Sequence, residues 1–452
     1  MSLIIRRAPS QNHQKEIKGL KSAALTLTIE KMFLCYKKCR GKSAKFGQEG
    51  RTIMDREEAV VYIRDFIASR RDEMTELSDY LGSHPELSGE EYESSRLFAD
   101  RLASYGFDVE IPFEGLPTAF MAKKRSEGAA FFRDFPVVAF LAEYDALPGI
   151  GHACGHNVHG VISLYAGIAA SRALDSFGGE VRVVGTPAEE TDGAKALLAE
   201  RGVFDDTGLA LMFHSYAKES FVSYRSLALE GYEFEFTGKA SHAAASPWLG
   251  ISAQNGMLLF MDALNMLRLR MRDMCRLHAV VTEVSGATNV IPDKAVCRVE
   301  ARAPRKALLK EIMEDVFAAA NGAAMATRTG VRFDRFMRGF DDILPNLAAE
   351  NMAEDVLSAY GVKCVLKNEP LGSTDVGNVS YRCPALQPEF AITDKEMSLH
   401  TVEFAKAALS GEAHDALVTG AMALAEICVR FLSDRPLRDA IRNEFLKNLA
   451  SA

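Results

Sequence analysis

The chain has 452 residues, 48% of them hydrophobic and 25% charged, which is the composition of an ordinary globular protein rather than a disordered or fibrous one. Its formal net charge of −8 argues against nucleic-acid binding, and the absence of a long, uninterrupted apolar run argues against a membrane protein. This length predicts two domains, and eight scattered cysteines indicate free thiols in a reducing compartment, which favours the cytoplasm.

The N-terminal region differs from the rest of the chain. Residues 1–51 hold 12 Lys or Arg against 3 Asp or Glu. We expect residues 1–53 to be a basic extension that is disordered, carries a targeting signal or precedes a start at Met54. Asp55 is the expected N-cap of the first helix of the folded part.

Three predicted strands each end in side chains that can bind metals. These are 136–142, followed by Glu143 and Asp145; 181–185, followed by Glu189 and Glu190; and 209–213, followed by His214. Helices alternate with the strands, which predicts an α/β fold with a mostly parallel central sheet. Ligands bind at the carboxyl edge of such sheets, so we expect these side chains to share one rim.

The loop after the first of these strands concentrates potential ligands. His152, Cys154, His156 and His159 lie between Gly151 and a predicted helix over 161–174. A lone Cys-x-His is weak evidence, because a loop histidine beside an inert cysteine is common. Its position at a strand end, shared with Glu190 and His214, makes a metal centre the better interpretation. We expect His152 and His159 to be structural or to support the ligands.

The pattern changes over 229–338. Strands and helices alternate as β-α-β-β-α-β, the ferredoxin-like unit, which predicts a domain inserted into the larger one. The expected strands are 232–238, 279–285, 295–301 and 331–336, and the expected helices are 250–270 and 304–326. The larger domain then comprises 54–228 and 339–452, with a helix near 346–360 and a strand at 363–367.

The adjacent carboxylates Glu189 and Glu190 suit metal-assisted hydrolysis. A divalent cation makes water acidic enough to act as a nucleophile, and a carboxylate beside it can take the water's proton. One glutamate could bind metal while the other faces the substrate. The competing interpretations are an acidic turn that caps the next helix, a closed structural zinc site and a binding protein without catalysis.

Eight motifs occur in the order typical of one family: Glu143–Pro148, His152–His156, Pro187–Glu190, His214–Ser215, Gly238–Ala243, Asn289–Pro292, Gly372–Asp375 and His400–Thr401. Together they resemble the aminoacylase/carboxypeptidase G family of two-metal peptidases, in its amidohydrolase branch. Within that branch the chain is most similar to p-aminobenzoyl-glutamate hydrolase subunits and β-alanyl-lysine-type dipeptidases. The resemblance covers about residue 54 to the end.

The resemblance implies a di-metal peptidase domain with an inserted lid that forms a homodimer. Its implied metal ligands, for two Mn²⁺ or Zn²⁺ ions, are Cys154, His156, Glu190, His214 and His400. Glu189 would be the general base and acid, and Asp145 would support the metal site. His242, with Asn289, would reach the partner's site and stabilise the oxyanion, and Ser373 and Asp375 would line the substrate pocket. Other branches have His-x-Asp where this chain has Glu143-Tyr144-Asp145, so Glu143 is not expected to be a ligand.

The implied activity is hydrolysis of the amide bond of a small N-acyl or N-aroyl amino acid or a dipeptide. The alternatives on the same fold are a deacetylase, an N-carbamoyl amidohydrolase and a non-catalytic homologue. No nucleic-acid or membrane partner is expected.

Overall fold

The computed structural model describes residues 53–126, 135–367, 369–370 and 372–452. The predicted basic extension therefore lies almost wholly outside the described residues. Ile53–Ala452 forms one compact unit. The domain boundaries at 228 and 338 stay predictions.

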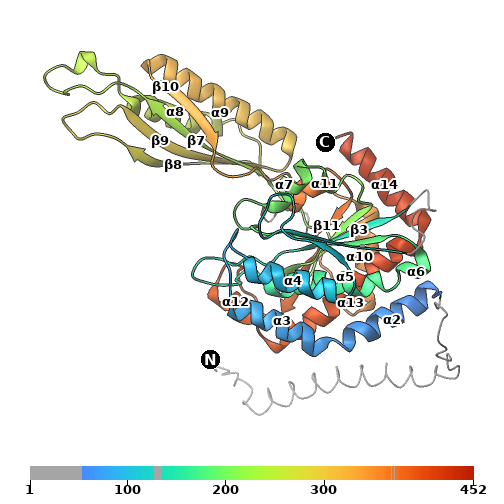
Figure 1. Cartoon of the computed structure of the whole chain (residues 1–452). Coiled ribbons are helices and arrows are strands. Elements are labelled where there is room, and N and C mark those ends of the chain that lie inside the picture. Colours follow the sequence, from blue (N-terminus) through green and yellow to red (C-terminus); the bar gives the residue numbers. More distant parts are fainter. Residues whose placement is uncertain (1–52, 127–134, 368, 371) are drawn as a thin grey trace, which may run out of the picture. The chain divides into compact units, whose positions relative to one another are not determined.

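A mixed sheet forms the centre of the larger domain (Figure 1). It has six strands in the order β1-β2-β4-β3-β5-β11. Its strands are β1 (Asp108–Glu110), β2 (Phe120–Arg125), β3 (Val137–Ala142), β4 (Glu180–Gly185), β5 (Leu209–Leu211) and β11 (Ala385–Leu386). The last four strands in this order are parallel to one another, while β1 and β2 extend the sheet in antiparallel fashion. The predicted α/β fold with a mostly parallel sheet is confirmed.

Helices cover both faces of this sheet. All six residues of β3 are buried, and they alternate between two hydrophobic cores, Val138 and Phe140 in one and Ala139 and Leu141 in the other. The first core includes side chains of α2 (Arg56–Ala68), α3 (Arg71–Ser83), α4 (Tyr92–Ser104), α5 (His156–Ser171), α6 (Leu174–Phe177), α10 (Leu347–Ala359), α12 (Val402–Ala407), α13 (Gly411–Ser433) and α14 (Arg435–Leu449). The second core includes α7 (Ala194–Glu200) and α11 (Val376–Ser380). A strand covered on both faces reads as a continuous apolar run, as β3 does.

Helix α5 approaches the sheet closely enough to fix the site. A Cβ atom at Gly160 would lie 2.0 Å from the carbonyl oxygen of Glu143, so only glycine allows this packing. The helix begins at His156, earlier than the predicted start at 161, because Gly155 adopts a left-handed φ of 77° that ends the loop. His156 is therefore held on a rigid element.

Of the helices described, α13 alone is long and apolar enough to cross a membrane by length and composition. Its most apolar window is 72% buried within the protein, and the helix packs against α5, α2 and β12 (Glu389–Thr393). These contacts account for its apolar character as a core helix.

The inserted segment forms its own antiparallel sheet, in the order β10-β7-β9-β8 (Figure 1). Its elements are β7 (Ala228–Thr237), α8 (Ala253–Arg268), β8 (Arg276–Val284), β9 (Lys294–Ala303), α9 (Lys306–Thr327) and β10 (Gly330–Arg335). This element order confirms the predicted β-α-β-β-α-β unit. Both helices share one hydrophobic core with the sheet.

A short two-stranded sheet pairs β6 (His214–Ala217) with β12 in parallel. Strand β6 follows β5 in the chain, and this pairing holds His214 at the carboxyl edge of the central sheet. The predicted strand at 363–367 was wrong, because only an isolated bridge between Ser220 and Cys364 forms there.

Candidate active site

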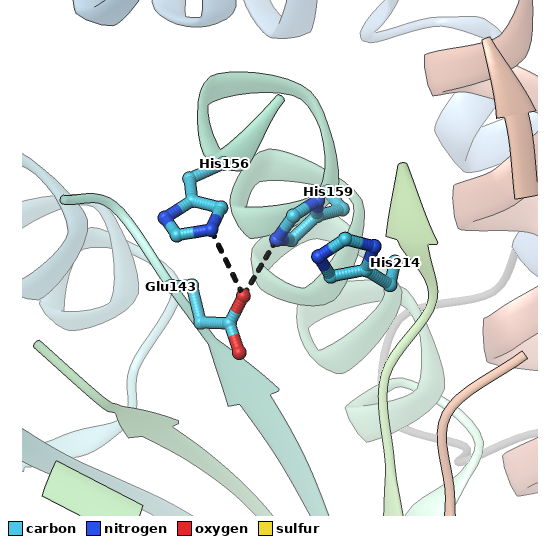
Figure 2. Close-up of side chains that lie close together, drawn as sticks. All are labelled: Glu143, His156, His159 and His214. Carbon is cyan, nitrogen blue, oxygen red and sulfur yellow. Dashed lines mark hydrogen bonds and ion pairs between the residues drawn. The ribbon is translucent and has the colours of Figure 1, made fainter. Parts of the chain in front are cut away.

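Four side chains meet at the carboxyl edge of the central sheet (Figure 2). Glu143 follows β3, His156 and His159 project from the first turn of α5, and His214 begins β6. The Oε2 atom of Glu143 lies 2.7 Å from His159 Nε2 and 3.6 Å from His156 Nε2. The expected convergence of strand ends therefore occurs.

The structure brings together all five residues predicted as metal ligands. Donor atoms of Cys154, Glu190 and His400 lie within 4.8 Å of one another, and His156 and His214 belong to the adjoining cluster around Glu143. Cys154 Sγ lies 3.4 Å from His214 Nε2, and Glu190 Oε1 lies 3.2 Å from His400 Nε2. The two clusters thus form one continuous donor set.

A buried donor atom tests whether this set fits a cation. His156 Nε2 has no hydrogen-bond partner among the described residues, and it lies 3.9 Å from Glu190 Oε1, which is 3.2 Å from His400 Nε2. An unpaired buried polar atom is costly, so one that faces a carboxylate and a second imidazole fits a bound ion. Thiolate, imidazole and carboxylate donors together suit zinc or a transition metal.

Carboxylates orient the imidazoles of His156 and His214. His156 Nδ1 lies 2.9 Å from Asp145 Oδ1, and His214 Nδ1 lies 2.9 Å from Glu389 Oε2, which leaves each Nε2 to face the cluster. Burial alone would lower the pKa of His156 and His214, but Asp145 and Glu389 outweigh it and raise each pKa to about 9. Cation binding at these nitrogens would displace protons.

Glu389 was not foreseen from sequence. The surrounding sequence Gln387-Pro388-Glu389 contains no ligand motif, and His214, with which Glu389 pairs, is 175 residues away. Asp145, by contrast, lies where the sequence placed it. Its second oxygen also accepts hydrogen bonds from Ser88 Oγ and the backbone N–H of Glu190. One carboxylate thus links the β3 loop to the loop that follows β4.

Glu189 lies on a constrained turn beside the donor set. Ala188 has a φ of 58°, uncommon for a residue other than glycine, and its N–H donates to the buried carboxylate of Glu91 at 2.8 Å. Burial, and then the charges of Glu143 and Glu190, raise the pKa of Glu189. A carboxylate with a raised pKa is suited to accept and return a proton. Glu91, which holds this turn, was also missed from sequence.

His400 reaches the centre from the far end of the chain. Its φ of 59° is left-handed, and its N–H donates to the carbonyl oxygen of Ala153 at 2.8 Å. This bond fixes His400 beside the Cys154 loop. Its side chain remains 53% exposed, so it forms the open side of the donor set.

A fully buried lysine lies behind the centre. The ammonium of Lys195 lies 2.6 Å from Asp375 Oδ1 and 2.7 Å from Glu143 Oε1. Asp375 was predicted to line the substrate pocket, but it is fully buried and faces Lys195, whose backbone N–H it also accepts at 3.0 Å. Ser373 does line the cavity. The role of both in substrate binding stays a prediction.

An open cavity of about 720 Å³ lies against the donor set. Four of the five predicted ligands line it, all but His156, together with Glu189 and Glu389. The rest of its wall is largely apolar or uncharged. These lining residues are Thr191, Tyr216, Tyr224, Leu229, Met337, Phe340, Gly372, Ser373, Thr374, Gln387, Met397, Ser398 and Leu399, and the charged pair Glu300 and Arg302 completes the wall. The volume suits a small molecule.

Neither His242 nor Asn289 is among the described residues that line this cavity. Both are exposed, and their loops touch, since Ala243 N–H donates to the carbonyl oxygen of Asn289. His242 Nδ1 accepts the backbone N–H groups of Ala244 and Ala245. In the neutral ring, the proton therefore lies on Nε2, which remains free to donate.

Comparisons with known proteins agree with this geometry. Residues 228–327 match the family described as peptidase dimerisation domain, M20_dimer. The Xaa-Arg dipeptidase of Mus musculus is 32% identical over 394 residues, covering 84% of this chain and 91% of that protein. A p-aminobenzoyl-glutamate hydrolase subunit of Escherichia coli (strain K12) is 29% identical, covering 85% of this chain and 94% of that protein.

Solved structures share the fold. A putative aminohydrolase from methicillin resistant Staphylococcus aureus superposes with a TM-score of 0.69 at 20% identity, covering 82% of this chain and 99% of that one. The aminobenzoyl-glutamate utilization protein of Klebsiella pneumoniae gives 0.64 at 18% identity, with the same coverage. The family predicted from the motifs is thus confirmed: the chain belongs to the M20 peptidase family and is a metal-dependent hydrolase of C–N bonds.

Proposed function

We propose that the protein hydrolyses the amide bond of a small N-acyl or N-aroyl amino acid or a dipeptide. The observation that carries this proposal is Glu189, which lines a cavity of about 720 Å³ beside five convergent metal-ligand side chains. The names of the relatives, a dipeptidase and an aminobenzoyl-glutamate hydrolase subunit, support the same class of bond.

The donor set would hold two divalent ions, through Cys154, His156, Glu190, His214 and His400. The thiolate favours Zn²⁺ and the carboxylates accept Mn²⁺, so both are candidates. When bound, such ions supply Lewis acidity that polarises the amide carbonyl and acidifies water.

The protein's own residues transfer the protons and stabilise the developing charge. Glu189 takes a proton from the attacking water and later gives it to the amine nitrogen as the C–N bond breaks. The His242 imidazole donates its Nε2–H to the carbonyl oxygen as negative charge develops there. Asp145 and Glu389 hold the ligand imidazoles so that these do not rotate during turnover.

His242 does not line the cavity of its own chain. For His242 to act on the substrate, a second copy of the chain would therefore have to supply it, as in a homodimer. The inserted sheet ends at β8, an edge strand on which Val280 and Val281 are 57% and 44% exposed. Helix α8 packs beside β8 and exposes Met266, and Leu269, directly after the helix, is exposed as well. An exposed apolar edge strand is a template for pairing with a second copy.

Mixing two inactive variants tests this arrangement. In a dimer of His242→Ala and Glu189→Ala chains, the site that keeps Glu189 receives His242 from its partner, so one working site per mixed dimer should form. We expect mixing, with exchange of protomers verified by mass, to restore hydrolysis well above either variant alone. If hydrolysis does not increase after verified exchange, the proposal that His242 serves the partner's site is wrong.

A substrate panel tests the function itself. The metal-loaded protein should release an amine from at least one of N-acetyl amino acids, N-carbamoyl amino acids, p-aminobenzoyl-glutamate and α- or β-alanyl dipeptides. Preference for N-acetyl or N-carbamoyl substrates would identify a deacetylase or carbamoylase instead of a dipeptidase. Failure to hydrolyse every class would contradict the proposal.

A further inference from the structure

One buried side chain on the cavity wall carries a hydroxyl that the protein itself does not use. Tyr224 is only 9% exposed, and it lines the cavity beside the metal-ligand side chains. Among the described residues, Tyr224 hydrogen-bonds only through its backbone carbonyl oxygen, which accepts from Arg225 Nη1 at 3.0 Å. Its phenol oxygen therefore has no partner there.

The other buried tyrosines of the described chain use their hydroxyls structurally. Tyr144 Oη donates to the carbonyl oxygen of Thr118 at 2.5 Å, and Tyr165 Oη accepts from Arg101 Nη1 at 3.1 Å. Neither tyrosine lines the cavity. A buried phenol ordinarily finds a partner, because an unpaired hydroxyl costs free energy. The hydroxyl of Tyr224 is thus available to a molecule bound in the cavity.

The polar end of Tyr224, and not only its ring, lies at the cavity wall. The ring belongs to the second hydrophobic core, where its centroid lies 6.4 Å from that of Phe221. Its Oη lies 3.4 Å from the position that a Cβ atom would take on Gly372, which lines the same cavity. Apolar packing therefore anchors the ring while the hydroxyl faces the wall.

Backbone hydrogen bonds fix Tyr224 relative to the metal centre. It lies in the segment between β6 and β7. Phe221 and Glu389, the carboxylate that orients a ligand imidazole, exchange two backbone hydrogen bonds of 3.0 and 2.9 Å. Three residues after Tyr224, the N–H of Leu227 donates to the carbonyl oxygen of Gly372 at 2.6 Å. Both sides of the segment are thus tied to the cavity wall.

The surroundings of this hydroxyl indicate what it can bind. Burial, and then the charges of Glu389 and Glu189, raise the pKa of Tyr224, so the phenol is a neutral donor at neutral pH. Glu189 and the ligand Cys154 line the same cavity, so the amide carbon that is attacked must lie beside them. The oxygen on that carbon gains negative charge during the attack and accepts hydrogen bonds. The amine nitrogen, by contrast, receives its proton from Glu189.

We infer that Tyr224 is a further catalytic residue, whose O–H donates a hydrogen bond to the oxygen of the scissile carbonyl as that oxygen becomes negative. This inference rests on the proposed amide hydrolysis and adds a donor from the same chain to the one supplied by His242. The phenol keeps its proton throughout, so its contribution is the hydrogen bond alone. A fixed donor aimed at a developing charge stabilises the transition state more than the bound substrate.

Replacing Tyr224 with phenylalanine removes the hydroxyl and keeps the ring. On the substrate that the wild type hydrolyses fastest, we expect kcat to fall by about a hundredfold and KM to change by less than about threefold. Metal content per chain should stay that of the wild type. The urea midpoint should be unchanged or higher, because the variant no longer buries an unpaired hydroxyl.

Tyr165→Phe is the matched control, because it removes a buried phenol oxygen that is paired with Arg101 and lies away from the cavity. It should lower the urea midpoint and leave kcat unchanged. The two variants should therefore separate stability from turnover in opposite directions, which a structural role for both hydroxyls would not do.

Binding of a phosphinate analogue of the same substrate tests the contact without turnover. The phosphinate places a tetrahedral anion where the carbonyl group would lie, so Tyr224→Phe should bind it about a hundredfold more weakly than the wild type. The product amino acid should bind both proteins equally.

Three results would overturn the inference while leaving amide hydrolysis intact. They are wild-type kcat and phosphinate affinity in Tyr224→Phe, a change in KM alone, and a Tyr224→Phe chain that is less stable than the wild type. The last would show that the hydroxyl has a structural partner. No hydrolysis of any substrate by the wild type would overturn the proposed function and the inference together.

Discussion

Replacing Glu189 with glutamine should lower kcat by about a thousandfold while the metal content per chain stays that of the wild type. Glutamine keeps the size of the side chain but cannot accept the proton of the attacking water. Glu189 lies beside the donor set, and its pKa is raised by burial and by neighbouring carboxylates, as a proton-transfer group requires. Single-turnover rates and metal analysis of the same preparation provide the measurement.

Two control variants distinguish loss of the general base from loss of a metal ligand. Glu190→Gln should lose bound metal, because Glu190 Oε1 lies in the donor set 3.2 Å from His400. Glu396→Gln should change neither property, since Glu396 is an exposed carboxylate paired with Lys218. Near-normal turnover in Glu189→Gln would exclude Glu189 as the base.

Replacing Lys195 with methionine should lower the free energy of unfolding by about 3–5 kcal/mol and weaken metal binding. Methionine fills the space but leaves Asp375 and Glu143 buried without their cation. Burial would lower the pKa of Lys195, but Asp375 and Glu143 outweigh it and raise that pKa, so the wild-type lysine is charged. Urea unfolding and chelator competition provide the two measurements.

The effect should reach the metal centre through a chain of buried contacts. Glu143, paired with Lys195, accepts the Nε2–H of His159, whose Nδ1 accepts the N–H of Ser215. Ser215 Oγ in turn donates to the carbonyl oxygen of Gly155, the residue between Cys154 and His156. Loss of the lysine charge therefore disturbs the loop that carries two ligands.

A second substitution should partly reverse the loss. Lys195→Met/Asp375→Asn removes one of the two uncompensated carboxylates, so it should be more stable than Lys195→Met alone. Lys218→Met, which removes a surface ammonium paired with Glu396, is the matched control and should behave like the wild type. Equal effects of Lys195→Met and Lys218→Met would show that the buried charge does not organise the centre.

Sequence alone predicted the parts of this site that strand order determines. Glu143, Glu190 and His214 each follow a parallel strand, and β4, β3 and β5 are neighbours in the sheet, so their carboxyl ends meet. The β-α-β-β-α-β unit was likewise predictable, because its alternation of strands and helices is local. Adjacent motifs such as Cys154-Gly155-His156 need no long-range information.

The supporting residues could not be found in this way. Glu389 meets His214, Lys195 meets Asp375 and Glu91 meets Ala188 across 97 to 180 residues of chain. No local sequence motif marks these supporting side chains, and only the tertiary packing brings each of them to its partner. The start of α5 was missed for a local reason, since the left-handed Gly155 places the ligand His156 within the helix instead of the loop.

Metal removal and restoration test the central claim most directly. The protein should be stripped with a chelator and then reloaded with Mn²⁺ or Zn²⁺, with amide hydrolysis and metal content measured at each step. We expect hydrolysis to vanish in the stripped protein and to return as two ions bind per chain. Full turnover by the metal-free protein, or no metal binding by the side chains around Cys154 and His156, would contradict the account.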